Sequence, residues 1–467
     1  MKEIMRELNK RFCVMLLLAV SVCSAPAQHA VPIPNKQQLA WQQAELGVLL
    51  SYDLHVLDTA KYNQQKNRIT PIADYNIFQP QHLNIEQWVL AAKAAGAKFA
   101  IFTVSHETGF VFYQSDVNPY CMKALKWRDG KADLIKEFVD ACRKHDVLPG
   151  LYLGIRWNAF FGVHDFKVNG AGEFQHNRQL YYNKMVEGMV TEICSRYGPL
   201  FEIWFDGGGS SPDRGGADIL PIVKKYQPDC LFYHNTQLAE ARWGGSETGI
   251  VNYPCWSTFP FPYTGAGESA PKEIGENDFA LLKTGDPNGK YFMPAMADLP
   301  LRGAGGRHEW FWEPGDEKHI FSVAHLTDVY KKSVGRNATL IIGLTPDNTG
   351  IIPQPDADTL AAFGKAINQL FGKPIAAAPA NNTLALSIPS GKKAGYIILG
   401  EDLQYGQCVR DFEILAKQKG KWKIIFEGSS IGNKFIFQLA PHFEASAIKI
   451  NIQSAIEKPI INRFELY

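Results

Sequence analysis

The chain has 467 residues, a length that fits roughly two to four domains, or one large barrel with a companion domain. Its 48 Lys and Arg residues nearly balance 47 Asp and Glu residues, and like charges form no block along the sequence. This balance argues against a nucleic acid or an anionic membrane as the partner. Aromatic residues make up 12% of the chain, and their flat faces suit both core packing and contact with sugar rings.

Residues 1–27 have the features of an export signal. Basic residues within the first 11 positions precede an apolar run over 12–25 that is too short to span a bilayer comfortably. Ala25 and Ala27 suit a cleavage site, so we expect a mature chain that starts near Gln28 in the periplasm or outside the cell. Lipid attachment at Cys23 is less favoured, because Val22 is larger than the small residue that usually precedes such a cysteine. No later segment is long and apolar enough for a membrane span.

The six cysteines beyond the signal are widely and irregularly spaced. They lack both a CxxC pair and the density of a disulfide scaffold, which predicts buried thiols for most of them. An exported protein allows one or two disulfides, and the spacing does not pair them.

From about residue 40 to 345, apolar runs typical of strands alternate with segments of helical periodicity. This alternation predicts an α/β fold, a (β/α)₈ barrel of the TIM type over residues 28–373, with a doubly wound sheet as the alternative. One predicted helix opens on Asn84 with Gln87 three positions later, which suits a capping box. The predicted strands are 47–53, 99–105, 148–154, 201–206, 230–235, 291–298 and 339–344. The predicted helices, besides the one at Asn84, are 132–145, 176–197, 217–226 and 319–334.

Polar and aromatic residues gather where these strands end, which favours the barrel because barrel enzymes build their sites from many strand ends. The residues concerned are His55, His106, Arg156, Trp157, Asp206, His234, Asn235 and Asp298. No GxGxxG motif opens a helix after the first strand, and Gly207 to Gly209 lack the Lys of a phosphate-binding loop. Nucleotide binding is therefore improbable.

The periodicity of the sequence changes after a predicted helix over 357–371 and a linker rich in Pro, Ala and Asn. Short alternating runs with turn signals every few residues then predict a β-sandwich over residues 374–467. Its expected strands are 384–388, 395–399, 411–415, 422–426, 434–438, 447–452 and 463–466. Packing against the barrel is a plainer role for this domain than carbohydrate binding.

Two carboxyl groups stand out as a candidate catalytic pair. Asp206 ends an apolar strand, and the glycines that follow allow a tight turn around it. Glu247 lies in a glycine-rich loop close to Trp256 and other aromatic residues, which could raise its pKa by desolvation. Glycoside cleavage needs one carboxylate as nucleophile or base and one protonated carboxyl as acid. Rivals for the second role are Glu107, Glu268 and Glu309.

The three histidines at strand ends, His55, His106 and His234, could hold zinc in principle. No HExxH or HxH pattern supports a metal, so we predict no metal and no other cofactor, and we expect these rings to bond hydroxyl groups. Many tryptophans lie on loops and strand ends and could equally line a sugar site or fill the core: Trp157, Trp204, Trp243, Trp256, Trp310 and Trp312.

These motifs resemble those of glycoside hydrolase family 29, the α-L-fucosidases, from about Trp41 to the C-terminus. Ile203-Trp-Phe-Asp-Gly207 is similar to the family's Trp-Phe-Asp-Gly segment, which implies that Asp206 is the nucleophile. The segment from Arg242 to Glu247 resembles the Arg-Trp-x-Gly-Asn-Glu motif of the subfamily that prefers branched α-1,3/1,4-linked fucose, which implies that Glu247 is the acid/base. Further similar segments are 133–144, 310–312 after Arg302, and 333–337.

The chain departs from the family where the sugar is recognised. Ser51-Tyr-Asp53 replaces His-Phe-Gly, His106-Glu-Thr-Gly-Phe110 replaces His-His-Asp-Gly-Phe, and Met296 replaces the Glu of Pro-Ala-Glu-x-Asp. The resemblance thus implies an exo-acting retaining glycosidase for an oligosaccharide or glycoconjugate, with L-galactose or L-glucose as alternatives to L-fucose. Asp53, His55, Glu107 and Asp298 are expected to read the altered sugar. The full set of expected substrate contacts is His55, His106, Glu107, Trp157, Trp204, His234, Trp243, Trp256, Asp298, Arg302 and Trp310.

Two other classes of function stay open. The altered recognition motifs would also suit a carbohydrate-binding protein without turnover. The three histidines at strand ends would suit a metal-dependent hydrolase. Oligomeric state is not predicted.

Overall fold

The computed structural model describes residues 31–58, 63–233, 236–264, 279–307, 310–379 and 384–467. The predicted export signal over 1–27, and the candidates His234, Glu268 and Glu309, lie outside these ranges.

Eight strands form one parallel sheet in the order β7-β6-β3-β2-β1-β12-β11-β8. The two end strands approach each other through a bridge between Tyr233 and Ala239 that follows β7, so the sheet is nearly closed. This arrangement confirms the predicted barrel. Its strands are β1 (Leu46–Leu50), β2 (Phe99–Ser105), β3 (Leu148–Leu153), β6 (Glu202–Trp204), β7 (Leu231–Tyr233), β8 (Arg242–Trp243), β11 (Ala295–Pro300) and β12 (Ala338–Leu344).

The strand β8 was not expected, because the glycine-rich segment around it predicts a loop. Two residues are too few to show an alternating pattern, and β8 is defined by its pairing with Ala295 and Met296 of β11. The run predicted as one strand over 291–298 also divides into two parts. Its first part, β10 (Tyr291–Phe292), pairs with β9 (Thr258–Phe259), and β11 begins after Pro294, whose backbone lacks an N–H.

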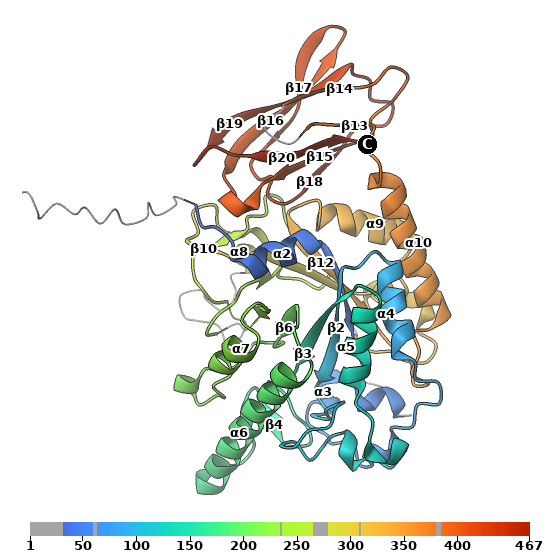
Figure 1. The fold of residues 1–467 in the computed structure, drawn as a ribbon, viewed down its shortest axis with the longest axis vertical. Helices are drawn as coiled ribbons and strands as arrows, with labels where there is room; N and C mark the ends of the chain where they lie inside the picture. Colours follow the sequence, from blue (N-terminus) through green and yellow to red (C-terminus); the bar gives the residue numbers. More distant parts are fainter. Residues whose placement is uncertain (1–30, 59–62, 234–235, 265–278, 308–309, 380–383) are drawn as a thin grey trace, which may run out of the picture. The chain divides into compact units, whose positions relative to one another are not determined.

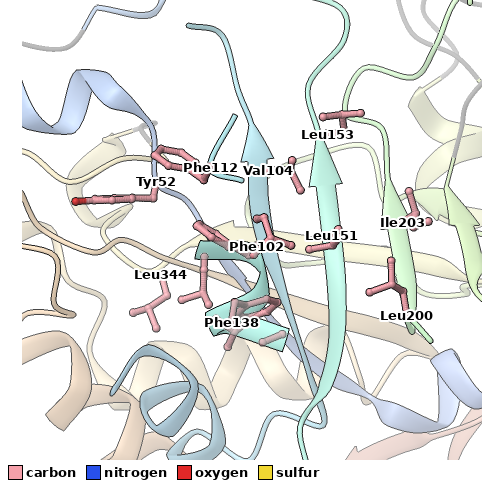
Figure 2. Close-up of a cluster of buried hydrophobic side chains, with 14 of the residues drawn as sticks. Tyr52, Phe102, Val104, Phe112, Phe138, Leu151, Leu153, Leu200, Ile203 and Leu344 are labelled. Atoms are coloured by element: carbon pink, nitrogen blue, oxygen red, sulfur yellow. The ribbon is translucent and has the colours of Figure 1, made fainter. Parts of the chain in front are cut away.

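Alternation along the barrel strands separates two hydrophobic layers. On β2, Phe99 and Ile101 point into the barrel beside Trp204 of β6, whereas Phe102 and Val104 point toward the surrounding helices. Figure 2 shows this outer layer, where Phe102 meets Phe138 of the helix α5 with ring centroids 5.5 Å apart. The barrel interior is therefore a packed core whose C-terminal end is left for a site.

Helices cover the outside of the sheet (Figure 1). α5 packs on β2 and β3, α4 packs on β1, and α4 contacts both α5 and α10. Asn84 caps α4 as predicted, with its Oδ1 accepting from the Gln87 N–H at 3.0 Å. The Gln87 side chain bonds the backbone of Ile352 instead of closing the capping box. The helices are α2 (Lys36–Ala44), α3 (Gln64–Asn67), α4 (Ile85–Ala94), α5 (Leu134–Lys144), α6 (Gly172–Arg196), α7 (Leu220–Tyr226), α8 (Phe279–Thr284), α9 (Val323–Lys332) and α10 (Gln354–Phe371). A small hairpin, β4 (Val163–His164) and β5 (Lys167–Val168), precedes α6.

The C-terminal strands form two antiparallel four-stranded sheets, ordered β13-β20-β15-β18 and β14-β19-β16-β17, which confirms the predicted β-sandwich. They enclose their own hydrophobic cluster, which includes Phe412, Ile450 and Phe464. The strand β13 was missed, since its two residues lie in the predicted linker. The strands are β13 (Ala376–Ala377), β14 (Ala385–Ser387), β15 (Tyr396–Glu401), β16 (Val409–Gln418), β17 (Lys421–Gly428), β18 (Phe435–Gln438), β19 (Ala447–Ala455) and β20 (Ile461–Leu466).

The six cysteines in the described part of the chain are buried free thiols, in line with their irregular spacing. Within the same residues, none of the helices has the length and apolar character needed to cross a membrane.

Candidate active site

A cavity opens at the carboxyl ends of the barrel strands, where the sequence predicts a site. Several strands contribute residues from their ends, as in other barrel enzymes. The walls include Ser51 after β1, His106 and Glu107 after β2, Arg156 and Trp157 after β3, Asp206 and Gly207 after β6, Glu247 after β8, Asp298 on β11, and Trp310 and Phe311 beyond it.

Asp206 lies directly beyond β6, with its side chain exposed to this cavity. The Tyr152 hydroxyl, from the neighbouring strand β3, donates to Asp206 Oδ2 at 2.8 Å. Gly207 follows with φ 65°, and a Cβ there would lie 2.8 Å from Arg156 Cδ. The glycine predicted to ease the turn thus also makes room for Arg156.

Glu247 stands on a loop that is fixed at both ends to β11. The N–H of Gly244 donates to the Met296 carbonyl at 2.7 Å, and the N–H of Gly249 donates to the Asp298 carbonyl at 2.8 Å. The Trp310 indole N–H donates to Glu247 Oε2 at 3.1 Å. Both members of the predicted carboxyl pair therefore line one cavity, although 41 positions of sequence separate them.

Asp298 brings a third carboxyl group to the same cavity. It is buried, and its Oδ1 accepts from the Trp243 indole N–H at 2.9 Å. Burial raises the pKa of Asp298 well above its usual value, and the negative charges of Glu247 and Asp206 raise it further. Asp298 thus keeps its proton at a pH where an ordinary Asp is ionised.

The predicted sugar contacts after β2 and β3 also lie in the cavity wall. The His106 ring stacks on Tyr152 with centroids 5.6 Å apart. The buried Glu107 accepts from Arg68 Nε at 2.6 Å, and the Arg68 guanidinium lies 4.5 Å from the Trp157 ring centroid. Trp204 and Trp310 complete this part of the wall.

Asp53 and His55 are buried outside the lining of the cavity. His55 Nδ1 is 3.6 Å from Asp53 Oδ2, and its ring meets Phe311 edge-on at 4.3 Å. Asp53 accepts from the N–H and hydroxyl of Thr108. Burial alone would raise the pKa of Asp53, but the hydrogen bond and charge of His55, with His106 and Thr108, lower it overall. These two residues lie behind the wall in this structure, and direct contact with the sugar stays a prediction for them.

Three further predicted contacts lie away from the cavity. Trp243 reaches Asp298 from behind the wall. Trp256 is buried beneath the Arg410 guanidinium, 4.7 Å from its ring centroid. Arg302 is buried and pairs with both carboxylate oxygens of Asp356, at 2.9 and 2.6 Å. Arg302 and Trp256 therefore make structural contacts within the protein, and a sugar contact stays a prediction for them.

Sequence reasoning missed Tyr152, Arg68 and Phe311. A signal existed for Tyr152, because strand alternation places it on the inward face at the end of β3 beside Trp204. No pattern pointed to Arg68, which follows the short helix α3 far from any strand end. Among the residues the structure describes, no three His, Cys, Asp or Glu side chains are grouped to hold a metal ion.

Comparisons with known proteins agree with this geometry. The α-L-fucosidase family model matches residues 31–259. A solved structure from Bacteroides thetaiotaomicron, assigned as an α-L-fucosidase, is 52% identical with a TM-score of 0.90, covering 94% of this chain and 99% of that one. A glycoside hydrolase 29 family member from an unknown rumen bacterium is 26% identical with a TM-score of 0.77, covering 94% and 78%. Alpha-L-fucosidase 1 of Arabidopsis thaliana is 24% identical over 94% of this chain and 88% of its own length.

A barrel whose strand ends bring two carboxyl groups and several aromatic side chains into one cavity defines a glycoside hydrolase. The relatives and solved structures that match 94% of this chain show which family of glycoside hydrolases it is. The chain belongs to glycoside hydrolase family 29, the α-L-fucosidase family, as its Trp-Phe-Asp-Gly segment indicates.

Proposed function

We propose that this protein is an exported, retaining exo-glycosidase that removes terminal α-L-fucose from oligosaccharides or glycoconjugates. The observation that carries the proposal is the pair Asp206 and Glu247, which come from different strands and line one cavity. Family membership supports fucose as the sugar, since the relatives are named as α-L-fucosidases. The export part rests on residues 1–27 alone.

The contacts of each carboxyl suit its role in a double displacement. Asp206 attacks the anomeric carbon, and the Tyr152 hydroxyl orients its carboxylate. Glu247 protonates the leaving oxygen and then removes a proton from the water that releases the sugar, while the Trp310 N–H fixes its position. The protonated Asp298 keeps a third negative charge out of the site.

L-Galactose or L-glucose is the second candidate for the sugar. Glu107 brings a buried carboxyl group to the cavity wall. Its oxygens can accept a hydrogen bond from the extra hydroxyl group that L-galactose and L-glucose carry and the deoxy sugar L-fucose lacks. Met296 lies on the barrel interior, where the family pattern has Glu, and this removes a polar contact. A carbohydrate-binding protein without turnover remains the alternative outcome.

One assay separates these functions. The assay compares three substrates, the aryl α-L-fucoside, α-L-galactoside and α-L-glucoside. Each is incubated with the wild type and with Asp206→Asn. The matched control is Asp213→Asn, which changes an exposed Asp on the same loop. We expect the fucoside to be cleaved fastest, with the α-anomer as first product by NMR. Asp206→Asn should lower kcat on the order of 10⁴-fold, with Asp213→Asn near the wild type.

Glu247→Ala adds a test of the acid/base role. A good leaving group departs without a general acid, so the variant still forms the glycosyl-enzyme from an aryl fucoside. Azide needs no general base to attack this intermediate, so it should restore turnover and yield a glycosyl azide. A β-anomer as first product would contradict double displacement. Binding of the sugars without cleavage would instead favour the carbohydrate-binding alternative.

A further inference from the structure

A second cavity lies beside the active-site cavity, around the hairpin of β4 and β5. Its volume is about 360 Å³, within the range of about 300–1,000 Å³ found for small-molecule sites. The hairpin supplies one wall, α6 another, and the loops after β6 and β7 the rest. The side chains that concern us are Asp165, Phe166, Gln175, Gln179, Ser210 and Thr236.

The two cavities share a boundary. Arg156 lines the first cavity, and its Nε donates to Asp165 Oδ1 of the second at 2.6 Å. The segment after β6 likewise has Gly207 in the first wall and Ser210 in the second. Ser210 lies four positions after Asp206, so their Cα atoms are at most about 14 Å apart. This separation is within the length of an oligosaccharide of a few units.

The hairpin holds Phe166 in this wall at a cost in backbone strain. Asp165 and Phe166 form its turn with φ values of 51° and 68°, a left-handed conformation that bulky side chains rarely adopt. Tertiary contacts maintain it. The Phe166 N–H donates to the Arg156 carbonyl at 2.9 Å, and Gln179 Nε2 donates to the Phe166 carbonyl at 3.0 Å.

The chemistry of the wall suits a ligand rich in hydroxyl groups. Phe166 offers an aromatic ring, whose centroid lies 5.8 Å from the Arg156 guanidinium carbon. Gln175 and Ser210 add an amide and a hydroxyl to the wall, and Lys167 and Arg214 add cationic donors. The Gln179 amide holds the hairpin, because it donates to the Phe166 carbonyl and accepts from the Val168 N–H. The charge of Asp165 is balanced by Arg156. A flat apolar surface with hydrogen-bonding groups around it suits a sugar ring.

We propose that this second cavity binds the part of the substrate beyond the scissile bond, the oligosaccharide that remains after the terminal sugar leaves. The inference rests on the proposed function. It makes Phe166 a specificity-determining residue that contacts the leaving group and takes no part in bond cleavage.

The variant Phe166→Leu tests this proposal, because it keeps an apolar side chain in the hairpin and removes the flat face. The matched control is Phe174→Leu on α6, whose side chain is 72% exposed and outside both cavities. An aryl α-L-fucoside, which fills only the first cavity, is compared with the Lewis X trisaccharide. We expect Phe166→Leu to raise KM for the trisaccharide five- to tenfold, with kcat and all aryl fucoside parameters unchanged.

Calorimetry with N-acetyllactosamine, the expected product, gives a readout that needs no turnover. The wild type and Phe174→Leu should bind it, and Phe166→Leu should bind it five- to tenfold more weakly. Equal KM values and equal binding for the wild type and Phe166→Leu would overturn the proposal. A wild type that cleaves neither fucoside would contradict the proposed function instead, and the calorimetry would still decide whether the second cavity binds sugar.

Discussion

Asp298 is a buried residue whose charge state affects both members of the proposed catalytic pair, Asp206 and Glu247. Its carbonyl holds the loop of Glu247 through Gly249, and its carboxyl holds Trp243. An ionised Asp298 would repel both Glu247 and Asp206, and the raised pKa avoids this. The residue therefore acts as a neutral positioning group in a site that otherwise depends on charge.

We expect Asp298→Asn to retain activity near neutral pH, because Asn is also neutral and its amide oxygen can accept from Trp243. The value of kcat/KM for an aryl fucoside should stay within about threefold of the wild type, with an unchanged acidic limb of the pH profile. Asp298→Ala should lose the Trp243 bond and fall on the order of 10²-fold. A displaced acidic limb in Asp298→Asn would mean that the wild-type residue carries a charge.

At the scale of elements, α2 closes the N-terminal end of the barrel. Trp41 of α2 donates its indole N–H to Glu202 Oε2 on β6 at 2.7 Å, and both side chains are fully buried. Burial raises the pKa of Glu202 from its ordinary value of 4.5 to about 8, although the bond from Trp41 acts in the opposite direction. The barrel thus buries a protonated carboxyl beneath the active site.

Glu202 should make stability depend on pH. In the folded state Glu202 keeps a proton that the unfolded chain releases. Its contribution to the free energy of unfolding is therefore complete below about pH 4.5 and is lost as the pH rises through about 8. Over that window we expect Glu202→Gln to gain about 1.4 kcal/mol of unfolding free energy per pH unit relative to the wild type. Urea unfolding at several pH values measures this difference. The exposed Glu173→Gln on α6 is the control, and parallel curves for wild type and Glu202→Gln would contradict the assignment.

At the scale of the whole molecule, Asn337 joins α2, the barrel and the sandwich. This buried residue precedes β12, and its Oδ1 accepts from Gln42 Nε2 and from the Asn433 N–H, both at 2.7 Å. Its Nδ2 donates to the Cys255 carbonyl at 3.0 Å and to Ser257 Oγ at 2.9 Å. Its φ of 69° suits Asn better than most side chains, which explains an Asn at the end of the 333–337 segment.

We expect Asn337→Ala to lower the unfolding free energy by about 2–4 kcal/mol, because it leaves several buried polar partners unsatisfied. Chemical denaturation measures the change. Asn451→Ala on β19 removes a single side-chain bond, to Glu413, and should cost less than about 1 kcal/mol. Equal losses for both variants would show that the junction adds nothing beyond an ordinary hydrogen bond.

The sequence by itself determined the barrel and the sandwich, and it pointed to Asp206 and Glu247, which the structure places in one cavity. Periodicity and contiguous motifs are local properties of the chain. The sequence could not find β8, whose two residues are defined only by their partner strand. Nor could it show that His106 lines the cavity whereas His55 lies behind Phe311, because both follow strands in the same way.

Only the tertiary structure decided which polar groups meet. Arg302 pairs with Asp356, and Tyr152 bonds Asp206; each pair is separated by 54 positions of sequence. A single sequence carries no signal for such contacts, because they depend on which strand ends and helices the fold brings together. The candidate catalytic groups follow from local motifs, and their surroundings follow from packing.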